Sequence, residues 1–107
     1  MSPQKINDPL VESVVKKIAE AIQPAKIILF GSKAKGTDRH DSDIDLLIIK
    51  DAMPSKRDLK LRIRRLFPRQ NFSMDLFVLT SDEFRKQQNV ANTIARAAVR
   101  DGRVYYG

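Results

Sequence analysis

The sequence predicts an α/β protein with a small mixed three-stranded sheet flanked by about four helices. Two observations lead to this fold class. Short apolar runs rich in Ile, Leu and Val alternate with longer segments whose apolar residues recur at helical spacing. Residues typical of turns and helix ends separate these segments. A chain of 107 residues has room for one hydrophobic core, so we expect a single domain over residues 1–107.

The first half of the chain predicts a helix and then a buried strand. Asp8-Pro9 suits a helix start, and Gln23-Pro24 suits its end. Between them, apolar residues recur at helical spacing: Leu10, Val11, Val14, Val15, Ile18 and Ile22. Residues 26–30 (KIILF) are β-rich and bounded by Pro24 and Gly31, which predicts a strand. Residues 32–35 are expected to form a short helical turn.

The second half predicts two further strands and two further helices. Residues 43–49 (DIDLLII) and 72–79 are expected to be strands, and residues 54–67 a helix stopped by Pro68. Thr80 and Glu83 have the spacing of a capping box. The helix that they start is expected to run on to Asp101-Gly102.

Composition indicates a soluble protein that attracts anions. The chain holds 20 Lys and Arg against 13 Asp and Glu, for a net charge of +7. This excess favours nucleotides, nucleic acid or an acidic protein face, unless it only solvates the surface. Without cysteine there are neither disulfides nor thiolate metal sites. No apolar run suits a membrane span and no signal peptide is apparent, so we expect a cytoplasmic protein.

Three aspartates are the candidate metal ligands. Asp43 and Asp45 are two apart on an expected strand, so both leave one face, roughly 6.5 to 7 Å apart. Asp75 lies inside the next strand, where a lone Asp is a poor β-former and costly to bury unless paired or bound to a metal. Clustered carboxylates repel each other, and a divalent cation reverses this. All-oxygen ligands select a hard ion, Mg²⁺ (magnesium) or alternatively Mn²⁺.

Each aspartate also has a purely structural explanation. Asp43 could cap a strand, Asp45 could pair with an arginine, and Asp75 could face water. The combination with a glycine turn favours the functional interpretation. Gly31 follows its strand directly, where a backbone without Cβ can approach a ligand, and Ser32 adds a hydroxyl at the start of a short helix. The alternative is an ordinary strand-to-helix turn.

Gly31-Ser32, ten further residues and Asp43-Ile44-Asp45 resemble the signature of the DNA polymerase beta-like nucleotidyltransferase superfamily. The longer string GSKAKGTDRHDSDIDLLII resembles its minimal nucleotidyltransferase (MNT) branch, single-domain proteins often paired with a HEPN-domain partner. Asp75 stands where that family carries its third carboxylate, and the ending ARAAVRDGRVYYG is similar to the branch's usual close.

The resemblance implies a nucleotidyltransferase fold and a set of roles. Gly31 and Ser32 would bind the nucleotide phosphates. Asp43 and Asp45 would bind two Mg²⁺ ions, and Asp75 would complete the metal site and act as base for the attacking hydroxyl. The implied reaction is in-line attack on the α-phosphate of ATP or another nucleoside triphosphate, with pyrophosphate leaving. In the MNT branch the implied role is that of an antitoxin that transfers AMP to a HEPN toxin.

A non-catalytic binding module on the same fold, either an antitoxin or a nucleic-acid adaptor, is the alternative function. The basic segment of residues 56–69 could dock triphosphate, RNA or an acidic partner, or simply be solvated. Few aromatic residues interleave with these cations, so nucleic acid is the less favoured partner. Lys33, Lys35 and His40 could assist near the glycine turn. Tyr105 and Tyr106 are expected to pack after the last helix.

Overall fold

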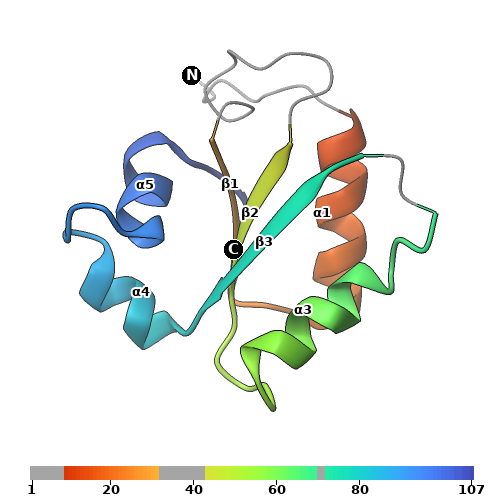
Figure 1. Cartoon of the computed structure of the whole chain (residues 1–107), viewed down its shortest axis with the longest axis horizontal. Helices are drawn as coiled ribbons and strands as arrows, with labels where there is room; N and C mark the ends of the chain where they lie inside the picture. Colours follow the sequence, from red (N-terminus) through yellow and green to blue (C-terminus); the bar gives the residue numbers. More distant parts are fainter. Residues whose placement is uncertain (1–8, 32–42, 70–71) are drawn as a thin grey trace.

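A computed structural model describes residues 9–31, 43–69 and 72–107 of the chain. These residues form a four-stranded sheet in the order β3-β2-β1-β4, with helices on both sides (Figure 1). Within these ranges no helix combines the length and the apolar character needed to cross a bilayer. The elements in chain order are α1 (Pro9–Ile22), β1 (Lys26–Phe30), β2 (Ile44–Ile49), α3 (Lys56–Arg64), β3 (Met74–Leu79), α4 (Ser81–Gln87), α5 (Ile94–Asp101) and β4 (Arg103–Tyr106).

The sheet is mixed, as the sequence predicts. Strand β1 pairs antiparallel with β2 and with β4, whereas β2 and β3 run parallel, in register from Ile44 opposite Met74 to Ile49 opposite Leu79. Consequently the last residue of β1 and the first residues of β2 and β3 lie at one end of the sheet. We call it the site end, and it is the upper end of β1 and β2 in Figure 1.

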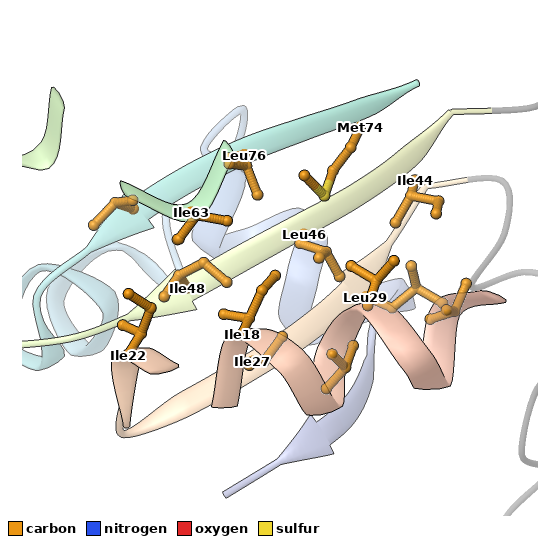
Figure 2. Close-up of a cluster of buried hydrophobic side chains, with 14 of the residues drawn as sticks. Ile18, Ile22, Ile27, Leu29, Ile44, Leu46, Ile48, Ile63, Met74 and Leu76 are labelled. Atoms are coloured by element: carbon orange, nitrogen blue, oxygen red, sulfur yellow. The ribbon is translucent and has the colours of Figure 1, made fainter. Parts of the chain in front are cut away.

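One face of the sheet packs against α1 and α3. Most of the apolar stripe expected for the first helix is buried there with alternate residues of the strands, as Figure 2 shows for Ile18, Leu46 and Leu76. Leu10, which the sequence placed in this stripe, is exposed instead. Leu59 and Ile63 of α3 close the same cluster. Each such side chain contributes about 1.5–3 kcal/mol by leaving water. This core fixes the strands that carry the candidate site residues.

The opposite face packs against α4 and α5. Ile28, Leu47 and Ile49 point to this side and form one buried cluster with Ala98 of α5. Phe30 and Phe77 also belong to this cluster, with ring centroids 5.5 Å apart. Since side chains alternate along a strand, Asp45 and Asp75 lie on the same face as Leu47 and Phe77. The acids are therefore on the α4–α5 side of the sheet, beyond the edge of an apolar cluster.

Most element boundaries agree with the sequence. Strand β1 spans the predicted residues 26–30, and α1 ends at Ile22, before Gln23 in a left-handed conformation (φ 54°). Helix α3 is shorter at both ends than the predicted residues 54–67. It begins after Ser55, whose hydroxyl accepts a 3.0 Å hydrogen bond from Asp58 N–H, and it ends at Arg64. Strand β2 starts at Ile44, so Asp43 lies just before it. Strand β3 starts at Met74 rather than residue 72.

The prediction of one continuous helix over residues 81–101 is wrong. Helix α4 ends at Gln87, and α5 starts only at Ile94. Asn92 between them is left-handed (φ 66°), which no helix accommodates. The Thr93 hydroxyl donates to the Gln87 carbonyl at 3.0 Å and accepts from Arg96 N–H at 3.1 Å. Thr93 thus ties the end of the first helix to the start of the second. The Thr80–Glu83 capping box is confirmed.

The sheet also has a strand that the sequence did not predict. Residues Arg103–Tyr106 form β4 at the edge beside β1, where the expectation was a packed tail. Gly102 makes this turn possible through close packing rather than an unusual backbone. A Cβ at Gly102 would lie 2.2 Å from the Ala98 carbonyl oxygen and 2.6 Å from the Ile28 side chain. The chain therefore passes from α5 into β4 with no room for a side chain.

Candidate functional site at the start of strands β2 and β3

Two aspartates from different strands stand next to each other at the site end. Asp45 is the second residue of β2 and lies opposite Asp75, the second residue of β3, in the parallel pairing. A parallel pair places registered side chains on the same face. Asp75 is exposed and Asp45 half-buried. Thirty residues separate them in sequence, so the fold alone creates this carboxylate pair.

The environment of Asp45 disfavours its negative charge. Its pKa is raised from the ordinary 3.8 to about 6, first by burial and then by the charges of Asp75 and Asp43. A side-chain hydrogen bond with Asp75 adds to this shift. Neighbouring apolar residues bury Asp45: it pairs with Phe30 of β1, and the buried Leu46 and Leu47 follow it in β2. Asp45 therefore sits where an added positive charge would be strongly favoured.

Asp43 is the third carboxylate of the group. It lies immediately before β2 and is exposed. Its charge raises the pKa of Asp45, which places it within electrostatic reach of the pair. The sequence analysis expected Asp43 and Asp45 on one face of a strand, with Asp75 completing the site. In the structure Asp45 and Asp75 are in register on neighbouring strands, and Asp43 lies just before β2.

Gly31 packs directly against Asp45. It follows the last residue of β1 and has a left-handed backbone (φ 79°). A Cβ built on Gly31 would lie 2.3 Å from Asp45 Oδ2, so any side chain there would displace the carboxylate. The sequence analysis assigned Gly31 to close approach of a nucleotide. The structure adds a second reason for glycine, which is the close approach of Asp45 itself.

Several predicted site residues lie outside the described part of the chain. Ser32, the second candidate for phosphate binding, is one of them, as is the helical turn expected over residues 32–35. His40, Lys33 and Lys35 also fall in this segment. Their roles stay predictions, whereas Gly31, Asp43, Asp45 and Asp75 all come together at the site end.

The chemistry of the three carboxylates fits a hard divalent cation. Carboxylate oxygens are the ligands that Mg²⁺ and Mn²⁺ prefer. Burial, and then the charges of Asp75 and Asp43, raise the pKa of Asp45, and a bound cation would favour its charged form. Among the described residues no three acidic, His or Cys groups are already arranged to hold an ion. Asp45 and Asp75 supply a facing pair, and Asp43 would have to turn toward it.

Three basic residues of α3 are anchored to other elements. The Lys56 ammonium pairs with Glu83 of α4 at 2.8 Å, and the Arg62 and Arg64 guanidiniums donate to backbone carbonyls of Ala21 and Met74. These anchored cations connect α3 to three other elements. The sequence offered no signal for this, because helical spacing shows which way a cation points but not which carbonyl it meets.

Comparison with known proteins shows which family this arrangement belongs to. The family model for the nucleotidyltransferase domain matches residues 11–101. This range contains Gly31, Asp43, Asp45 and Asp75 and nearly every described element. No curated protein matched the sequence.

Solved structures share the fold at low sequence identity. A toxin–antitoxin crystal structure with AMP-PNP superposes with a TM-score of 0.64 at 20% identity, covering 90% of this chain and 73% of that one. A Sulfolobus solfataricus structure assigned as a nucleotidyltransferase gives a TM-score of 0.58 at 22% identity, covering 90% and 76%. A toxin–antitoxin MntA–HpeT mutant with two Asp-to-Glu substitutions gives 0.63 at 18% identity, covering 90% and 73%.

Proposed function

Because this chain belongs to the family of nucleotidyltransferase domains, we propose that it transfers a nucleoside monophosphate from a nucleoside triphosphate to a hydroxyl group, with Mg²⁺ held by Asp43, Asp45 and Asp75. One observation carries the proposal: Asp45 and Asp75 face each other in register on parallel strands, with the Gly31 backbone against Asp45. A purely structural protein would have no use for two carboxylates whose charges raise the pKa of Asp45.

The chain's own residues bind and orient the reactants. Gly31 and Ser32 would contact the phosphates, and Asp75 would accept the proton of the attacking hydroxyl. The hydroxyl oxygen then bonds to the α-phosphorus, the bond from that phosphorus to the β-bridging oxygen breaks, and pyrophosphate leaves. Paired divalent ions supply charge neutralisation in such transfers. Positioning and electrostatics suffice here, because phosphoryl-type transfer needs little covalent help.

We further propose that the nucleotide is ATP and the acceptor a hydroxyl of a HEPN-domain toxin, so that AMP transfer makes this protein an antitoxin. Three points support this. The sequence resembles the MNT branch, and two neighbours that share the fold come from toxin–antitoxin systems, one of them with AMP-PNP. The net charge of +7 also suits a triphosphate ligand.

The test is a label-transfer assay. The protein, Mg²⁺, ATP labelled at the α-phosphate and a HEPN-domain protein from the same genome are incubated and resolved on a gel. We expect label on the HEPN protein with wild type and none with Asp45→Asn or Asp75→Asn. Omitting Mg²⁺ should also remove the label. Transfer that survives both substitutions would overturn the proposed site.

Asp51→Asn is the matched control. Asp51 lies just after β2, at the end away from the site, where its carboxylate accepts hydrogen bonds from Ser81 N–H (2.7 Å) and Ser81 Oγ (2.8 Å). Label transfer should persist in this variant. Neutralisation of the HEPN protein without any label would instead favour the binding-module alternative.

A further inference from the structure

Arg64, in the last turn of α3, contacts the strand that carries Asp75. Its Nη2 donates a 3.1 Å hydrogen bond to the carbonyl oxygen of Met74. That carbonyl and the Asp75 N–H belong to the same peptide group. The guanidinium therefore holds the peptide unit from which the Asp75 side chain departs.

The Met74 carbonyl is on the side of β3 that no strand covers. β3 is at the edge of the sheet, next to β2. On its inner side the Ser73 carbonyl accepts from Ile44 N–H at 2.9 Å. Successive carbonyls of a strand point to opposite sides, so the Met74 carbonyl points outward. In the described part of the chain, Arg64 takes the place that a neighbouring strand would have there.

Aromatic contacts reinforce the same corner between α3 and β3. Phe67, just after α3, stacks edge-on against Phe72, just before β3, with centroids 6.0 Å apart. The Lys17 ammonium of α1 lies 5.4 Å from the centre of the Phe67 ring. The start of β3 is therefore fixed by the Arg64 hydrogen bond at its open edge and by the packing of Phe72 against Phe67.

We propose that Arg64 is a positioning residue: by fixing the Met74–Asp75 peptide at the open edge of β3, it sets the placement of the Asp75 carboxylate opposite Asp45. This deepens the proposed function and rests on it. Outer residues that orient metal-binding side chains typically change affinity or activity by about 10–100-fold when removed. An ordinary surface arginine would change neither.

Arg62 provides a matched control on the same helix. Its Nη2 also donates to a backbone carbonyl at 3.1 Å, but that carbonyl belongs to Ala21 in α1. Both arginines are exposed. Arg62→Ala and Arg64→Ala thus remove the same group and the same kind of hydrogen bond. The bond is lost to α1 in the first variant and to β3 in the second.

The experiment compares Arg64→Ala, Arg64→Lys and Arg62→Ala with wild type in three measurements. These are kcat and KM for ATP in label transfer, the affinity of the nucleotide-free protein for Mn²⁺ by calorimetry, and the ¹³C resonance of the Asp75 carboxyl carbon by NMR. We expect Arg64→Ala to lower kcat and Mn²⁺ affinity by about 10-fold, with KM little changed, and to shift the Asp75 resonance. Arg64→Lys should recover part of each loss, and Arg62→Ala should match wild type.

Equal effects of Arg64→Ala and Arg62→Ala in all three measurements would overturn the proposal, as would wild-type behaviour of Arg64→Ala. Failure of the proposed function is recognised separately, because the wild type would then transfer no label. In that case the Asp75 resonance still decides: a shift confined to Arg64→Ala supports the positioning role, and no shift refutes it.

Discussion

The Gly31 backbone touches the carboxylate of Asp45, so closely that a methyl group on Gly31 would stand 2.3 Å from Asp45 Oδ2. Gly31 also has φ 79°, a conformation that side chains disfavour independently of space. Two separate penalties thus oppose any other residue at this position, one from the backbone and one from Asp45. They can be separated by experiment.

Gly31→Ala should destabilise the fold and abolish nucleotidyl transfer. The left-handed backbone alone costs about 1–2 kcal/mol with a side chain, and the contact with Asp45 adds to it. In an Asp45→Ala background the contact is gone, so the same substitution should cost less. Urea unfolding of the four proteins in this double-mutant cycle measures the difference. Strict additivity would show that Asp45 does not crowd Gly31.

Asp45→Asn should stabilise the metal-free protein at neutral pH. Folding raises the pKa of Asp45 from 3.8 to about 6, so the folded state binds more protons than the unfolded one between these values. This group therefore lowers stability as pH rises from about 4 to about 6. The melting temperature of Asp45→Asn should match wild type near pH 4 and exceed it at about pH 7. A constant difference across this range would contradict the shift.

Mg²⁺ should stabilise the protein through the carboxylate pair. At a concentration ten times the dissociation constant, an ion that binds only the folded state adds about 1.4 kcal/mol. Thermal unfolding with Mg²⁺ and then with EDTA measures this. The gain should shrink as the pH falls below about 6, because a proton on Asp45 competes with the ion. Asp75→Asn should lose the gain, and Asp51→Asn should keep it.

Thr80→Ala should weaken the fold but not the site. The Thr80 hydroxyl accepts from Glu83 N–H at 3.1 Å, and the Glu83 carboxylate accepts from Thr80 N–H at 2.9 Å. Loss of such a cap costs about 1 kcal/mol. Because Thr80 follows the end of β3 away from Asp75, transfer activity per folded molecule should not change. A selective loss of activity would mean that the two ends of β3 are coupled.

The carboxylate Asp75 illustrates what the sequence could predict. An acid inside an apolar strand is costly unless it has a partner. The resemblance to the MNT branch indicated that the partners of Asp75 are Asp43 and Asp45. Spacing along the chain placed Asp43 near Asp45, but it could not show that Asp75 stands directly opposite Asp45. Register across a parallel pair decides such contacts, and it depends on how α3 returns the chain.

The C-terminal third shows what the sequence could not predict. Ala91, Ile94, Ala95 and Ala98 continue a helical spacing through the break, so periodicity alone implied one helix. The break depends on the left-handed backbone of Asn92 and on the hydrogen bonds of Thr93. In the sequence these two residues look the same as ordinary polar residues on the surface of a helix. Strand β4 is only four residues long and pairs with β1 more than seventy residues earlier. Nothing local encodes such a pairing.

Parallel pairing of β2 and β3 separates two demands along the same strands. At their starts lie acids that lower the stability of the metal-free protein. Just past their ends lie the Asp51–Ser81 hydrogen bonds and the N-cap of α4, which contribute to stability alone. Substitutions at the end away from the acids can thus change thermal stability and leave the transfer activity unchanged. Improved caps or ion pairs around α4 could offset the instability of the acids. The added stability would then allow destabilising substitutions near Asp45 in a protein that still folds.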